Sequence, residues 1–150
     1  MELILDSANI EQIKELNELL TVTGVTTNPT IITKSGKEPE VVIKELIDLL
    51  DEDQLLFIQA VRTDYEGIME EAKAISKLRK KNMYVKIPVT HEGLKAIKEC
   101  KENFSGLIIA GKMHAAGVDE PVVDIPTIKE FIEAGADVIL MPAAGTVPGL

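Results

Sequence analysis

The stretch MYVKIPVT, residues 83–90, has the composition of a buried β-strand that ends at a proline. Its one charged residue is Lys86, which stands between Val85 and Ile87. Burying an ammonium group without a partner is costly. Burial also lowers the pKa of a lysine, and the neutral amine that results attacks carbonyl groups to form a Schiff base. Lys86 is therefore a candidate nucleophile.

Ordinary structural roles are the alternative for this lysine and for other polar residues. A lysine near a strand end commonly lays its methylene groups on apolar surface and keeps its ammonium in solvent. Asp6 could instead cap a helix. Asn28 precedes Pro29 and could instead be a turn residue. The chemical interpretation therefore depends on several such residues converging at successive strand ends.

On both sides of MYVKIPVT, short apolar segments alternate with amphipathic segments. The apolar segments are 2–6, 23–29, 55–61, 83–89, 106–111 and 137–143, and helical spacing is found at 7–20, 39–50, 64–80, 91–102 and 125–135. We expect Ser7 to cap the first helix. Repeated strand–helix units with apolar strands predict a parallel sheet covered by helices, an α/β fold.

Two α/β architectures fit this pattern: an incomplete (βα) barrel of about six strand–helix units, and an open doubly wound parallel sheet. Length favours the open sheet, because a complete barrel has eight strands and typically about 250 residues. The polar strand ends favour the barrel, since Asp6, Thr26, Asn28, Gln59 and Lys86 lie at or near the carboxyl ends of four successive strands. A barrel directs such ends towards one centre, so we expect the incomplete barrel.

Composition predicts one globular domain over residues 1–150 and limits its partners. The chain is 45% hydrophobic and 27% charged, with a formal net charge of −9. This charge disfavours a nucleic-acid surface, which needs a basic stripe. We expect no membrane partner, because no apolar stretch approaches the roughly 18 residues that span a bilayer. The start of the chain lacks the pattern of a signal peptide, and the single Cys100 fits a reducing, cytoplasmic setting.

Four stretches resemble the transaldolase family, and most closely its small members, the fructose-6-phosphate aldolases. They are LILDSANIEQIKEL, GVTTNPTII, FIQAV and YVKIPVTHEGLKAIK, which begin at residues 3, 24, 57 and 84. GVTTNP followed some sixty residues later by VKIPVT is a specific pair. The resemblance covers residues 1 to about 100, and it implies a (βα) barrel of the class I aldolase type.

The resemblance also implies roles for five residues. Lys86 would form the Schiff base, Asp6 would assist proton transfer, and Asn28 and Thr26 would contact the substrate. Gln59 would hold a catalytic water, as glutamine does in the aldolase branch, where transaldolases proper carry a glutamate. The family works on sugar phosphates, needs no metal or other cofactor, and its small members often form rings, so we expect a homo-oligomer.

After about residue 103 the sequence departs from this pattern. The stretch GLIIAGKMH, residues 106–114, lacks the threonine of the family, and AGADVILMPAAG, residues 134–145, lacks its tyrosine and arginine. We therefore expect residues 104–150 to form a divergent or truncated barrel segment. Lys112 and His114 in this segment have two interpretations. They could act as a second amine and a proton shuttle, or contact a phosphate. Alternatively, they are simply solvated residues where a strand ends.

These sequence features are compatible with two functions of different classes. The first is a Schiff-base aldolase or transaldolase-like enzyme, acting on a small ketose or ketose phosphate. The second is a non-catalytic partial-barrel scaffold, or oligomerising remnant, that keeps the first half of the family fold. The intact strand-end residues favour the first, and the departures after residue 103 favour the second.

Overall fold

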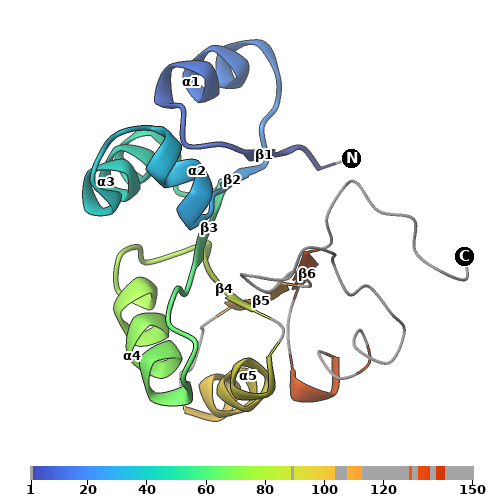
Figure 1. Cartoon of the computed structure of the whole chain (residues 1–150). Helices are drawn as coiled ribbons and strands as arrows, with labels where there is room; N and C mark the ends of the chain where they lie inside the picture. Colours follow the sequence, from blue (N-terminus) through green and yellow to red (C-terminus); the bar gives the residue numbers. More distant parts are fainter. Residues whose placement is uncertain are drawn as a thin grey trace, which may run out of the picture.

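The computed structural model describes residues 2–88, 90–103, 108–112, 129, 132–135 and 138–140 (Figure 1). The strands are β1 (Ile4–Asp6), β2 (Gly24–Thr26), β3 (Leu55–Gln59), β4 (Met83–Pro88), β5 (Ile108–Lys112) and β6 (Val138–Leu140). The helices are α1 (Ile10–Leu19), α2 (Pro29–Lys34), α3 (Pro39–Leu49), α4 (Tyr65–Ser76) and α5 (His91–Asn103) in the described part of the chain.

The strands of the described part form one parallel sheet whose order follows the chain, from β1 to β6. Figure 1 shows these strands as an arc, with α1, α3, α4 and α5 on its outer side. A doubly wound sheet reverses its strand order and carries helices on both faces. The open-sheet alternative is therefore wrong, and the predicted incomplete (βα) barrel of about six strands is confirmed.

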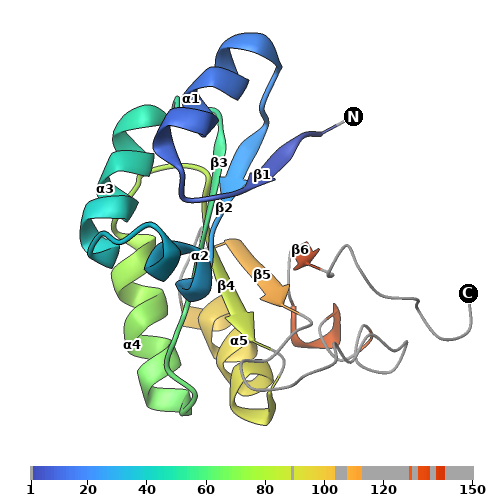
Figure 2. The same ribbon diagram turned by 45° about the horizontal axis from the view of Figure 1, so that its top comes forward.

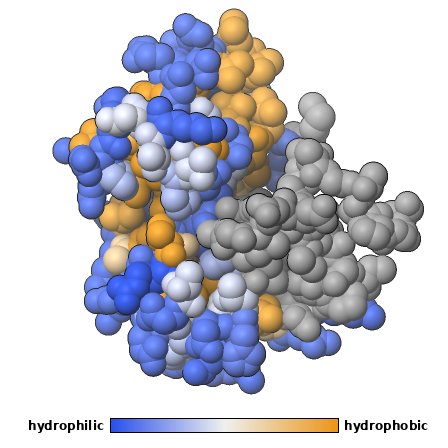
Figure 3. Space-filling model, viewed as in Figure 1, coloured by the Kyte–Doolittle hydropathy of each residue, from blue (hydrophilic) through white to orange (hydrophobic). Residues whose placement is uncertain are grey.

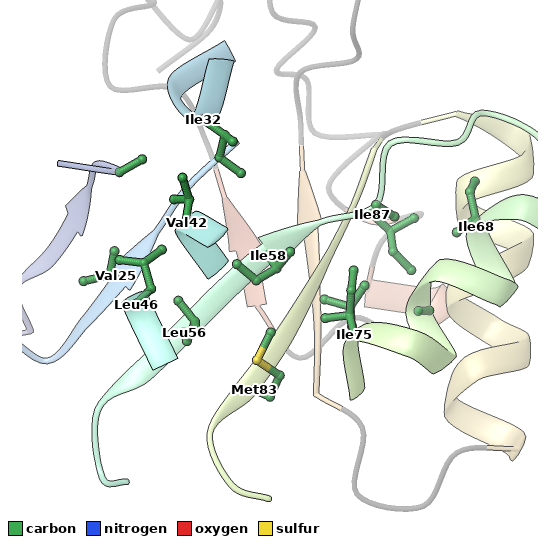
Figure 4. Packing of buried hydrophobic residues seen from close by; sticks show 14 of the residues in the cluster. Val25, Ile32, Val42, Leu46, Leu56, Ile58, Ile68, Ile75, Met83 and Ile87 are labelled. Carbon is green, nitrogen blue, oxygen red and sulfur yellow. The ribbon is translucent and has the colours of Figure 1, made fainter. Parts of the chain in front are cut away.

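The outer face of this barrel wall carries the hydrophobic core. Val25 of β2 pairs in register with Leu56 of β3, which in turn pairs with Met83 of β4. All three side chains are buried, and Figure 4 shows them beside Leu46 of α3 and Ile75 of α4. Each such burial contributes roughly 1.5–3 kcal/mol. Because side chains alternate along a strand, the neighbours of these residues face the concave side of the wall.

Two local details differ from the sequence prediction. Asn9 caps α1, where Ser7 was expected, and its Oδ1 atom accepts from the Gln12 N–H at 3.2 Å. Ser7 lies two residues earlier, and its hydroxyl accepts from the Asn9 N–H at 3.0 Å. The short helix α2 was not predicted. It begins at Pro29, whose fixed φ suits the first helical position.

The wall has an apolar end at β1 and α1. β1 is the first strand in the sheet order, so no described strand pairs with its outer edge. Beside it, α1 and its C-cap expose Leu16, Leu19 and Leu20, and Leu19 is 79% exposed. Figure 3 shows hydrophobic surface at this end, and Figure 2 shows α1 next to β1 there.

The environment of Cys100 gives a first testable prediction. Its thiol is buried in α5, 3.4 Å from the Met69 Sδ atom, and burial raises its pKa to about 11. Because the thiolate is the nucleophile, we expect no reaction with a disulfide reagent at pH 8 until the chain is unfolded. Stability should also fall between about pH 9 and 11, where the unfolded chain releases this proton first. Equal labelling rates in native and denatured protein would contradict this.

Candidate active site

The concave face of the wall carries two rows of side chains near the carboxyl ends of the strands. In the first row, Thr26 of β2 pairs with Phe57 of β3, and Phe57 pairs with Tyr84 of β4. In the second row, two residues closer to the carboxyl ends, Gln59 pairs with Lys86. The period of two along each strand places both rows on one face, opposite the core.

Lys86 is buried on this face and is hydrogen-bonded to a strand two positions away in the sheet. The residue is 3% exposed, and its Nζ atom donates a hydrogen bond of 2.7 Å to Thr26 Oγ1. The alternative of a lysine with its ammonium in solvent is therefore wrong. The bond joins β4 to β2 across β3, so the wall must curve inwards here, and it gives the buried amine a polar partner.

The residues after Lys86 fix the start of α5 against the end of β4. The Thr90 hydroxyl accepts from the Gly93 N–H at 2.9 Å, and the Thr90 carbonyl accepts from the Leu94 N–H at 2.9 Å. A Cβ atom at Gly93 would collide with the Pro88 carbonyl oxygen, so only glycine allows this close approach. The spacing K-x-P-x-T-x-x-G thus anchors the strand that presents the amine.

Backbone contacts hold Gln59 beside Lys86. The next residue, Ala60, donates its N–H to the Lys86 carbonyl at 2.9 Å. The Val61 and Arg62 N–H groups then donate to one carboxylate oxygen of Glu71 on α4, at 2.6 and 3.0 Å. The end of β3 is therefore tied both to β4 and to the helix behind it. Gln59 itself is partly buried.

Asp6 and Asn28 lie in the same region and differ in their surroundings. Asp6 pairs in register with Thr26 and is exposed at the edge of the wall. It is not the helix cap, which is Asn9. Asn28 caps α2, because its Oδ1 atom accepts from the Ile31 N–H at 3.0 Å. This use of the oxygen leaves the amide nitrogen of Asn28 as a donor for other contacts.

The structure therefore joins Lys86 and Thr26 directly and aligns Gln59 with Lys86 and Asp6 with Thr26. Asn28 takes part in a local cap. That these residues share one substrate cavity stays a prediction. Lys112 ends β5 in register with Pro88, and His114 lies outside the described residues.

Two residues that sequence reasoning missed line the first row. Phe57 and Tyr84 stack with their ring centroids 4.4 Å apart. Their signal was present in the period of two, because Phe57 precedes Gln59, and Tyr84 precedes Lys86, by two positions.

Thr27 is a third residue without a predicted role. It is fully buried beside Thr26, and its Oγ1 atom has no hydrogen-bond partner among the described residues. A buried hydroxyl without a partner loses its hydrogen bonds to water and gains none in return.

Other possible sites in the described part lie elsewhere or lack the needed groups. A cavity of about 780 Å³ lies near the first turns of α1 and helices α2 and α3, where Asn9, Lys34 and Asp48 help to line it, so it is not the Lys86 site. No group of three His, Cys, Asp or Glu residues among the described residues could hold a metal ion. No described helix has the length and apolar character needed to cross a membrane.

The parallel strands in chain order, with a buried lysine at the fourth strand end, define a partial (βα) barrel whose polar groups gather at the carboxyl ends. The chain belongs to the transaldolase/fructose-6-phosphate aldolase family, whose pattern matches residues 3–104. This end point agrees with the predicted departure at about residue 103. Residues 82–150 also match a family described as a domain of unknown function, and this second match overlaps the first at β4 and α5.

Several curated relatives carry the description "Probable transaldolase". The protein of Clostridium acetobutylicum is 36% identical over 144 residues, which are 93% of this chain and 66% of the relative. The protein of Clostridioides difficile is 43% identical over 98 residues, 65% of this chain and 44% of the relative. The protein of Streptococcus pyogenes is 47% identical over 96 residues, which are 64% of this chain and 44% of the relative. The matches thus cover between 44% and 66% of these relatives.

The adjacent threonines give a matched pair of variants with opposite expected effects. Thr27→Val removes a buried hydroxyl without a partner and should stabilise the chain by about 1 kcal/mol. Thr26→Val removes the acceptor of the hydrogen bond from the buried Lys86 amine and should destabilise the chain by roughly 1–3 kcal/mol, the range for a buried donor that loses its acceptor. Urea unfolding measures both. Equal changes of the same sign would mean that these hydroxyls do not differ as the contacts indicate.

Proposed function

We propose that this chain is a Schiff-base (class I) aldolase or transaldolase-like enzyme that acts on a small ketose or ketose phosphate. The observation that carries the proposal is the amine of Lys86, buried at the carboxyl end of β4 and hydrogen-bonded to Thr26. Burial favours the neutral form, which is the nucleophile. Family membership supports the same class of reaction.

The reaction begins with attack of the Lys86 Nζ atom on the ketone carbon of the donor. The carbinolamine that forms loses water to give a protonated imine. Cleavage of the neighbouring carbon–carbon bond sends its electron pair into this imine, which leaves an enamine on Lys86 and releases an aldehyde. Addition of a second aldehyde to the enamine, followed by hydrolysis, completes a transfer. Addition of a proton to the enamine carbon instead restores a protonated imine, and its hydrolysis releases the ketone and completes a simple cleavage.

Four further residues support these steps in the proposal. Asp6, in register with Thr26, moves the proton to and from the reacting hydroxyl, directly or through water. Gln59, in register with Lys86, holds the water used in hydrolysis. The Thr26 hydroxyl and the Asn28 amide nitrogen are hydrogen-bond partners for the substrate hydroxyl groups. These assignments give each polar strand end one function.

The alternative is a non-catalytic scaffold that keeps the first part of the family fold. One observation favours it. The family's threonine, tyrosine and arginine are missing from residues 106–114 and 134–145. The scaffold would retain the Lys86–Thr26 hydrogen bond as a purely structural contact.

Trapping with borohydride separates the two functions. Incubation with dihydroxyacetone and borohydride should add one reduced donor to the chain, seen in the intact mass and mapped to the peptide that holds Lys86. Lys86→Met should abolish this adduct, because thioether sulfur cannot form an imine. Lys98→Met is the matched control, since Lys98 is exposed on α5 and should not affect trapping.

Trapping by Lys86→Met at the wild-type rate would show that Lys86 is not the nucleophile. If the wild-type chain forms no adduct at any donor concentration, the scaffold is the better account. A steady-state assay on a ketose phosphate then measures whether an imine-forming chain also turns over.

We also propose that the chain self-associates through the apolar end at β1 and α1. A strand edge that no described strand pairs with, next to exposed leucines, is a surface that a second copy can cover, with edge strands pairing across a two-fold axis. Light scattering should give more than the monomer mass at micromolar concentration. Leu19→Glu should shift the mass towards the monomer, whereas Leu78→Glu, an exposed leucine beyond α4, should not. A stable wild-type monomer would contradict this.

A further inference from the structure

Phe57 and Tyr84 form a stacked aromatic pair on the concave face, separate from the hydrophobic core. They are paired in register on β3 and β4, with ring centroids 4.4 Å apart and planes inclined by 30°. Phe57 is 1% exposed, yet it is not part of the cluster that packs between the strands and the helices. The pair therefore fills part of the barrel interior.

The strand register places this pair next to the Lys86 side chain. Lys86 starts in the second row, beside Gln59, and its amine reaches Thr26 in the first row. Thr26 is aligned with Phe57, and Tyr84 lies two residues before Lys86 on the same strand. The lysine side chain must therefore cross β3 on the concave face, from the row of Gln59 to the row of Phe57.

Two stacked rings at this place limit where the amine can go. Aromatic side chains have few rotatable bonds, and a stacked pair gains about 0.5–1.5 kcal/mol beyond its burial. The pair presents a rigid apolar surface on the amino-terminal side of the Lys86 chain. A rigid ring surface at this place limits movement of the lysine in that direction.

We propose that the Phe57–Tyr84 pair positions the Lys86 amine for attack on a carbonyl group. The two residues are positioning residues, because they act through Lys86 and need not touch the substrate. That this position serves catalysis rests on the proposed function. That the two rings lie beside Lys86 rests on the strand register and on the stacking of the rings. The stack, and not the Tyr84 hydroxyl, is the element that acts.

Two substitutions at Tyr84 test the stack against the hydroxyl. Tyr84→Phe keeps both rings and should trap dihydroxyacetone within about twofold of the wild-type rate. Tyr84→Val removes one ring and should lower the trapping rate at saturating donor by about tenfold or more, as expected when a reacting group is displaced. The donor concentration for half-maximal rate should change little, because the pair does not bind the donor.

A second readout does not depend on any ketone. Trace acetic anhydride at pH 10, where exposed lysines are in good part neutral, labels amines according to their access to the reagent. The ratio of Lys86 to Lys98 labelling, read by peptide mass spectrometry, should rise several-fold in Tyr84→Val and stay unchanged in Tyr84→Phe. This ratio tests the inference even if the wild-type chain traps no donor, which would be the failure of the proposed function alone.

Circular dichroism and urea unfolding first establish that each variant is folded, and Phe57→Leu replaces Tyr84→Val if the latter is not. A folded ring-deleted variant with wild-type labelling of Lys86 would overturn the inference. So would an equal loss of trapping in Tyr84→Phe and Tyr84→Val, because the hydroxyl would then be the element that matters.

Discussion

The hydrogen bond between the Lys86 amine and the Thr26 hydroxyl is the contact on which the arrangement of the site depends. It joins two strands that are not neighbours, across the strand between them. A flat sheet would hold these strands about twice the normal strand spacing apart, close to 10 Å. The long lysine side chain and the inward curvature of the wall together close this distance. The same bond gives a polar partner to an amine that is almost completely buried.

The curvature has its own cause on the other face of the wall. Val25, Leu56 and Met83 lie in register and pack against helices that all follow the outer side of the strands. Because side chains alternate, the strands that bury these residues outwards must direct Thr26 and Lys86 inwards. The core and the candidate site thus both follow from the alternation of side chains along the strands. A shift of the strand register by one residue would turn the core residues to the concave face and the site residues to the outer face.

The sequence predicted the features that depend on period and strand ends. These are the parallel wall and the placement of Lys86 at the end of β4. It did not predict α2, because six residues are too few for a helical period to be recognised. It placed the first cap at Ser7, since a serine and an asparagine two residues apart are equivalent by residue type. The stack of Phe57 on Tyr84 was also missed, because pairing between strands depends on a register that a single sequence does not contain.

Strand order that follows chain order has a consequence for how the wall is made during synthesis. Each new strand pairs with the strand that left the ribosome just before it, so the sheet grows by contacts between neighbouring units of the chain. Pairing between strands that follow one another in the chain lets the wall lengthen one strand–helix unit at a time. The Lys86–Thr26 bond is different, because it links residues 60 positions apart and passes over the unit between them. It can form only after the third strand is in place, and it then locks together three units that were added separately.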